Sequence, residues 1–418
     1  MMREEISRKI IHVVMGLFAL SLPFWVPSRG FVVIMGIAAV AILLVLRNVK
    51  KLREGVGSAL FGIDRKSYGE LYFAVSVVII FVLHQSTYEY LIPILVLTFA
   101  DSVAALIGKS YGRYNLAQKQ EDAKSSEGSV MFFIVAFICA LVPLQLMTEI
   151  GRPEVLVISF LIGILAAMIE AISANGNDNL LLPLLTYSFV RENAYISLDS
   201  LFTNFGIMLF FLVVILLVYK VMNITKLSIA YGMLVGYIAM IQGGWEWILP
   251  PLILILTYGI LPLMNEEERQ MKLSYKVIES NTIIGMVCLW VAVFVPQYRD
   301  ILYIAYSFSF ACFLAINTYS RFVNFVNTKR STAIVCGLLK GIVFIALPTW
   351  AISQVNWMII VLYVVFLTFA MPPSVRLNEK YDFKNVNDQT ARANKILVGT
   401  LTTIFAILIW AGQFGGIL

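Results

Sequence analysis

Long apolar stretches separated by short polar segments recur along the whole chain. An α-helix of about 20 apolar residues crosses the hydrocarbon core of a bilayer, so the pattern predicts transmembrane helices. We expect about fifteen, of which two, 179–195 and 228–241, are short enough to be re-entrant instead. The expected spans are roughly 10–26, 31–46, 71–87, 90–107, 129–147, 154–171, 179–195, 203–219, 228–241, 245–263, 281–296, 300–317, 333–353, 356–371 and 397–413.

The composition agrees with an all-α polytopic integral membrane protein. Of 418 residues, 60% are hydrophobic and 13% are charged, and the mean hydropathy of +0.85 is far from that of a soluble domain. No cleavable signal peptide is evident. The two histidines are too few for a His-rich metal centre, and the four cysteines lie in separate apolar runs, which argues against a disulfide framework.

The positive net charge of +6 reflects membrane topology rather than a nucleic-acid partner. With the N-terminus in the cytoplasm, only Arg29, Arg152, Arg191 and Arg299 among the 31 Lys and Arg residues fall on the far side, as the positive-inside rule requires. Nucleotides are available on the cytoplasmic side. The loops expected there are 47–70, 108–128, 172–178, 264–280, 318–332 and 372–396.

A carboxylate interrupts the apolar pattern at Asp101. Placing an Asp or Lys at the centre of a membrane helix costs about 3 kcal/mol, so such residues usually face a cavity and serve a function. Glycines and cations follow it at helical spacing: Gly108, Lys109, Gly112 and Arg113. The first glycine of a P-loop is absent, which excludes that motif. Close backbone approach and cationic donors favour an anionic, phosphorylated ligand at the membrane surface.

Two further polar clusters lie at helix ends. Lys124-Ser125-Ser126-Glu127-Gly128-Ser129 begins the fifth span, where Ser125 or Ser126 can cap the helix. Glu170 ends one span and Asp178-Asn179 begins the next. Carboxylate and amide oxygens are ligands suited to Mg²⁺, although the segment between them also has the Asn and Gly residues of an ordinary polar turn.

At the N-terminus, Arg8 and His12 are separated by four residues and share one face of the first span. Basic residues at this place also serve as routine orientation signals.

The order of these motifs resembles the phytol/dolichol kinase family. The motifs are Arg8-Lys9-x-x-His12, then Asp101 with Gly108 and Gly112, then Lys124 to Ser129, then Glu170 with Asp178-Asn179. The resemblance covers about residues 1–220. Members of that family, which includes a CTP-dependent diacylglycerol kinase, are membrane enzymes that transfer the γ-phosphate of a nucleotide, characteristically CTP, to a lipid alcohol.

The resemblance implies Mg²⁺-dependent phosphoryl transfer from CTP to phytol, farnesol, dolichol or another polyprenol, or diacylglycerol, at the cytoplasmic face. Such transfer needs mainly positioning and charge neutralisation. The residues expected in catalysis are Asp101, Glu127 and Lys124, with Asp101 favoured as general base. The expected metal ligands are Asp101, Glu127, Glu170, Asp178 and Asn179. The residues expected to bind nucleotide or phosphate are Arg8, His12, Gly108, Lys109, Gly112, Arg113, Ser126, Gly128 and Ser129.

The second half forms a separate module, 223–418, after a seam that ends the first module, 1–222. Its Gln242-Gly-Gly-Trp-Glu-Trp247 stretch resembles the membrane family that includes plant phytyl-phosphate kinase. Where that family carries an acidic stretch, this chain has Asn317 and Arg321. The loss of carboxylates predicts a catalytically silent module, or one that acts on a different substrate.

Two other functions remain open on the sequence alone. A lipid-phosphate cytidylyltransferase would also use CTP, Mg²⁺ and carboxylates, but would release pyrophosphate. A secondary transporter would explain many spans and short broken helices, although the charged residues gather at one membrane face. The sequence leaves the alcohol and the oligomeric state open.

Overall fold

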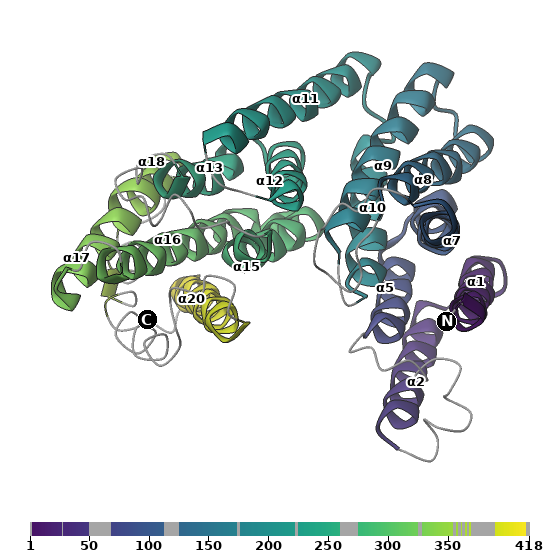
Figure 1. Ribbon diagram of the computed structural model, residues 1–418, viewed down its shortest axis with the longest axis horizontal. Coiled ribbons are helices and arrows are strands. Elements are labelled where there is room, and N and C mark those ends of the chain that lie inside the picture. The colour runs from purple at the N-terminus through teal and green to yellow at the C-terminus, as the bar shows by residue number, and fades with distance from the viewer. Residues whose placement is uncertain are drawn as a thin grey trace. The chain divides into compact units, whose positions relative to one another are not determined.

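The computed structural model describes residues 2–26, 28–49, 68–112, 125–173, 176–221, 225–259, 275–324, 328–353 and 389–414, with isolated positions between 357 and 368. Every secondary-structure element in these ranges is a helix. The chain divides into two compact units, Met1–Gly206 and Ile207–Leu418, with the boundary inside α11 (Leu198–Val221) (Figure 1). The functional modules predicted for residues 1–222 and 223–418 stay a prediction.

The α-helices of the first unit range from the 9 residues of Thr87–Leu95 to the 24 residues of Met2–Trp25. Proline and serine begin or interrupt several of them; for example, the side chain of Ser28 accepts a hydrogen bond from the backbone N–H of Phe31 at the start of α2. Its helices are α1 (Met2–Trp25), α2 (Arg29–Asn48), α5 (Gly69–Leu83), α6 (Thr87–Leu95), the π-helical turn η1 (Val96–Ala100), α7 (Asp101–Tyr111), α8 (Ser126–Met147), α9 (Arg152–Ile172) and α10 (Asp178–Asn193).

Eight helices in the described ranges are long and apolar enough to cross a membrane, as expected for an all-α integral membrane protein. The expected number of about fifteen spans is not confirmed. Several predicted spans form helices that are too short: α5 has 15 residues and α10 has 16. The predicted span 356–371 falls mostly outside the described residues. The eight candidates are Arg8–Trp25, Arg29–Asn48, Thr87–Tyr111, Ser126–Met147, Arg152–Ile172, Val277–Phe294, Pro296–Val323 and Arg330–Ser353.

The centre of the first unit is the continuous segment α6–η1–α7, which packs against α1, α8 and α10. Tyr90, Ile92 and Leu97 in this segment are completely buried. This central position explains why Asp101, at the junction of η1 and α7, is surrounded by other helices although its own helix is apolar.

Two hydrogen bonds between residues far apart in the sequence identify which segments lie at each end of α5. At one end of α5, the side-chain amide of Asn179 donates to the backbone oxygen of Gly69 at 2.9 Å. At the other end, the guanidinium of Arg29 donates to the backbone oxygen of His84 at 2.9 Å. The acidic residues at the start of α10 therefore lie at the end opposite Arg29, in agreement with the two loop faces expected from the sequence.

The second unit is built around one buried helix. Every residue from Ile301 to Tyr319 in α16 is buried, and α16 packs against α13, α15, α17 and α20. The helices of this unit that follow α11 are α12 (Lys226–Ile238), the π-helical turn η2 (Ala239–Gly243), α13 (Trp245–Gly259), α15 (Tyr275–Phe294), the 3₁₀ turn η3 (Pro296–Tyr298), α16 (Arg299–Asn324), α17 (Arg330–Gly341), the π-helical turn η4 (Ile342–Ala346), α18 (Leu347–Ser353) and α20 (Gln389–Phe414).

Candidate functional site

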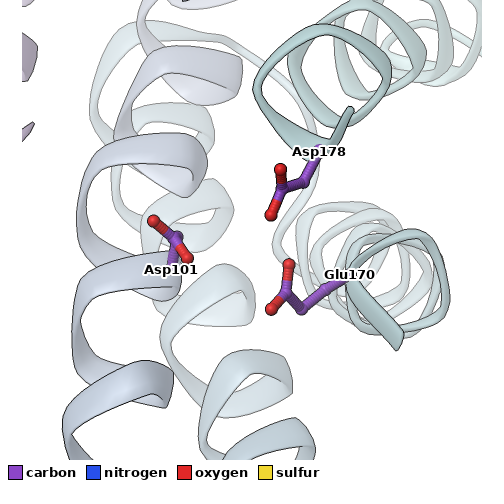
Figure 2. A group of neighbouring side chains, drawn as sticks. All are labelled: Asp101, Glu170 and Asp178. Atoms are coloured by element: carbon purple, nitrogen blue, oxygen red, sulfur yellow. The ribbon is translucent and has the colours of Figure 1, made fainter. Parts of the chain in front are cut away.

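Three carboxylates from three helix ends meet in the first unit. Asp101 is the first residue of α7, Glu170 lies in the last turn of α9, and Asp178 is the first residue of α10. One carboxylate oxygen from each lies within 4.8 Å of the others, and the three side chains point toward a common centre (Figure 2). In the described part of the chain, this is the one group of three or more His, Cys, Asp or Glu side chains close enough to share a metal ion.

A break in helix regularity places Asp101. Pro93 lies inside α6, and because proline has no N–H and crowds the preceding turn, it perturbs the regular hydrogen bonding. The backbone N–H of Val96 is shared between the oxygens of Ile92 and Pro93. The π-helical turn Val96–Ala100 follows directly. Such turns insert a residue into a helix and are frequent at functional sites. The turn sets the direction in which Asp101 leaves the helix.

Only the five residues 173–177 separate α9, which carries Glu170, from α10, which begins at Asp178. Gly176 has φ of +83°, a left-handed conformation that glycine adopts without strain. The backbone N–H of Asn179 donates to Oδ1 of Asp178 at 3.1 Å, while its side chain is bound to Gly69, as described above. Asn179, a predicted metal ligand, thus uses its amide nitrogen to join α10 to α5, and its role as a ligand stays a prediction.

Two basic side chains of α1 face Asp101. Lys9 Nζ lies 2.6 Å from Asp101 Oδ2 in an ion pair whose two side chains are 9% and 14% exposed. His12 Nε2 lies 3.6 Å from the same oxygen and 3.1 Å from the backbone oxygen of Leu97. Because a backbone oxygen only accepts hydrogen bonds, His12 Nε2 must carry the proton. The ring of His12 also meets Phe73 edge-on.

Lys9 is the functional candidate that the sequence analysis missed. The sequence predicts phosphate contacts for Arg8 and His12, which lie four positions apart, but Lys9 and His12 lie three positions apart and also share a helix face. Lys9 is buried, whereas Arg8 is half-buried. The sequence contained one signal, because its spacing places Lys9 and His12 on the same helix face. Only the fold shows that Asp101 lies opposite them.

The second predicted cluster forms a close helix contact rather than part of the three-carboxylate group. Ser125 Oγ accepts a hydrogen bond from the backbone N–H of Gly128 at 3.1 Å and caps α8, as expected. A Cβ at Gly128 would lie 3.1 Å from the backbone oxygen of Ala104. A Cβ at Gly108 would lie 2.9 Å from Ser125 Oγ. The glycines therefore allow α7 and α8 to approach closely; phosphate binding by them stays a prediction.

The remaining predicted residues are spread around the ends of α7 and α8. Ser126 Oγ donates to Glu127 Oε2 at 3.1 Å, and Glu127 is not a member of the three-carboxylate group. Ser129 is half-buried, whereas Lys109 and Gly112 are exposed. Two predicted residues, Arg113 and Lys124, lie outside the described residues.

Chemically, the group offers hard oxygen ligands with acidic charge and a neighbouring ammonium. Glu170 is buried, and Asp101 and Asp178 are half-buried. Carboxylates held this close repel each other unless a cation intervenes. Asp101, Glu170 and Asp178 have the ligand chemistry that Mg²⁺ prefers.

Fold and site together define a polytopic, all-helical membrane protein with an acidic and basic centre at one end of its first unit. Over 189 residues, the chain is 32% identical to a phytol kinase from Synechocystis sp., and this match covers 43% of the chain and 76% of that relative. The chain therefore belongs to the phytol/dolichol kinase family. No family model matches it, and no solved structure matches it. The resemblance of residues 223–418 to the phytyl-phosphate kinase family stays a prediction.

Proposed function

We propose that this protein is a lipid-alcohol kinase that transfers the γ-phosphate of CTP to a membrane lipid alcohol at the cytoplasmic face. The observation that supports the proposal is the convergence of Asp101, Glu170 and Asp178 in a chain related to a phytol kinase. A bound Mg²⁺ would neutralise phosphate charge and orient the transferring group. The candidate acceptors are phytol, farnesol, dolichol or another polyprenol, and diacylglycerol.

In this proposal, acidic residues bind the cation and basic residues bind the polyphosphate. Asp101, Glu170 and Asp178 hold the cation, and Lys109 at the exposed end of α7 meets the polyphosphate. Arg113 and Lys124 would add to this cationic side. The lipid chain lies among the membrane helices and presents its hydroxyl at the polar end of the unit. Asp101 Oδ2 already accepts a hydrogen bond from Lys9, so the proton of the attacking hydroxyl is better received by another carboxylate oxygen of the group.

The direct test is a reaction of the purified protein with Mg²⁺, CTP or ATP, and a panel of lipid alcohols. CDP together with a phosphorylated lipid is the expected result and identifies the acceptor. Release of pyrophosphate would instead indicate a cytidylyltransferase. Absence of turnover across the panel, with transport of a solute in vesicles, would contradict the kinase proposal.

Asp101→Asn is expected to abolish turnover while the protein remains in the membrane. Loss of an outer partner of a metal ligand already costs about 10–100-fold in affinity or activity, so loss of a ligand charge is expected to cost at least about 100-fold. Asp199→Asn is the matched control, because Asp199 is an exposed carboxylate at the start of α11. Full activity of Asp101→Asn would show that Asp101 is not part of the active site.

A further inference from the structure

Lys9 is a buried cation that contacts one residue of the carboxylate group twice. It is 7% exposed, and its Nζ donates to Asp101 Oδ2 at 2.6 Å and to the backbone oxygen of Asp101 at 3.4 Å. The two residues are separated by 92 positions in the chain and come from α1 and α7. A buried ammonium is costly unless paired and hydrogen-bonded, so this contact fixes Lys9 and Asp101 relative to each other.

The ion pair also sets the formal charge of the group. Asp101, Glu170 and Asp178 carry three negative charges when ionised, and Lys9 carries one positive charge, which leaves a formal charge of −2. A carboxylate has two oxygens and can contact a cation on each side. Asp101 can therefore keep its contact with Lys9 while it faces Glu170 and Asp178, and one divalent cation balances the remaining charge.

We propose that Lys9 is a positioning residue that holds Asp101 in the carboxylate group and limits this group to a single divalent cation. The effect of Lys9 on turnover rests on the proposed function. Its effect on cation binding does not, because the formal charge of the group follows from Lys9 and the three carboxylates alone. If the ion pair served only the fold and the group bound no cation, loss of the Lys9 charge would change stability and leave cation binding unchanged. The distinction is measurable, because an ammonium this close to a ligand opposes cation binding by direct electrostatic repulsion.

The experiment is a titration of the full-length protein in lipid nanodiscs with Mn²⁺, in which the free ion is followed by electron paramagnetic resonance. The wild-type protein is expected to bind one Mn²⁺ at this group, and Asp178→Asn is expected to lose it. Lys9→Met and Lys9→Gln are expected to bind Mn²⁺ at least about tenfold more tightly, because each variant removes a positive charge that repels the cation. Lys9→Arg keeps the charge and is expected to resemble the wild type.

Lys329→Met is the matched control, since Lys329 is an exposed cation in the second unit at the N-cap of α17. It is expected to leave the Mn²⁺ affinity unchanged. The two neutral variants at Lys9 guard against misfolding, because glutamine can still donate a hydrogen bond to Asp101. Unchanged or weaker Mn²⁺ binding in whichever of them folds, or more than one Mn²⁺ at this group in the wild type, would overturn the inference.

Turnover separates this inference from the proposed function. With the Lys9 variants, kcat is expected to fall because Asp101 loses the residue that orients it, while the Mg²⁺ concentration for half-maximal activity also falls. Normal kinase turnover in the wild type without the Mn²⁺ shift in the variants would reject the role of Lys9 alone. The Mn²⁺ shift without any lipid phosphorylation would reject the kinase proposal and leave the role of Lys9 in cation binding supported.

Discussion

At the scale of single residues, the close approach of three carboxylates has a thermodynamic consequence. Asp101, Glu170 and Asp178 each bring an oxygen within 4.8 Å of the other two, and like charges at this distance repel each other. The repulsion is present whenever the group holds no metal ion. A site arranged in this way trades stability for function, which is a common property of binding sites.

We therefore expect Asp178→Asn to raise the apparent melting temperature of the first unit in the absence of divalent cations by about 2–4 °C, the shift that about 1 kcal/mol gives in a unit of about 200 residues. The same variant is expected to lose the stabilisation by Mg²⁺ that the wild type gains through binding linkage. Thermal unfolding in detergent, with and without Mg²⁺, measures both. Asp199→Asn serves as the exposed control. A lower melting temperature without metal would show that Asp178 stabilises the fold.

The sequence identified the residues of this group for reasons that can be named. Asp101 interrupts an apolar helix, and Glu170 and Asp178 stand at the two ends of a short polar turn, so the last two had to be neighbours. Their juxtaposition with Asp101 depends on the π-helical turn Val96–Ala100, for which the sequence offers only Pro93 as a hint. Lys9 was missed because its contact with Asp101 spans 92 residues.

At the scale of helices, the crossing of α7 and α8 positions Asp101. An added Cβ at Gly128 would lie 3.1 Å from the oxygen of Ala104 and 3.4 Å from Cα of Gly108. Both neighbours are backbone atoms, so neither can move without a shift of α7. The sequence predicted that these glycines permit close approach of a phosphate group. The structure shows that they permit close approach of a second helix, and the phosphate contact stays a prediction.

Gly128→Ala is expected to destabilise the protein by about 1–3 kcal/mol, the usual cost of overpacking, and to lower turnover because α7 carries Asp101. The matched control is Gly206→Ala in α11, where an added Cβ meets nothing within 4 Å; there, the helix propensity of alanine predicts a gain of up to about 1 kcal/mol. Apparent melting temperatures and turnover of the two variants provide the comparison. Equal behaviour of the two variants would refute the close packing at Gly128.

Helix lengths show where sequence analysis of the fold succeeded and where it did not. Apolar runs predicted helices correctly in the first unit, since hydrophobic length is a local property. The number of membrane crossings is not local: α5 is apolar but has only 15 residues, and α10 has only 16. Whether a short helix crosses, re-enters or packs within the unit depends on its neighbours, which composition does not encode.

At the scale of the whole molecule, the two units differ in the use of their polar motifs. In the second unit, the stretch Gln242–Trp247 serves packing: Trp247 is 1% exposed, and its backbone oxygen accepts a hydrogen bond from the hydroxyl of Tyr306 at 2.5 Å. The guanidinium of Arg299 donates to the backbone oxygen of Gly243 and lies over the ring of Trp247. These contacts support a structural role for the motif that sequence analysis related to phytyl-phosphate kinase.

Neutralising carboxylates of the second unit is therefore expected to leave phosphoryl transfer close to that of the wild type. Glu246 at the start of α13 and Glu279 on α15 are half-buried and belong to no described group that could share a metal ion. The measurement compares Glu246→Gln and Glu279→Gln with Asp178→Asn under saturating CTP, Mg²⁺ and lipid alcohol. If the second unit is silent, only Asp178→Asn loses turnover, because the three carboxylates proposed to bind the cation belong to the first unit. A loss in Glu246→Gln or Glu279→Gln as large as that in Asp178→Asn, in protein that is equally stable, would instead place part of the chemistry in the second unit.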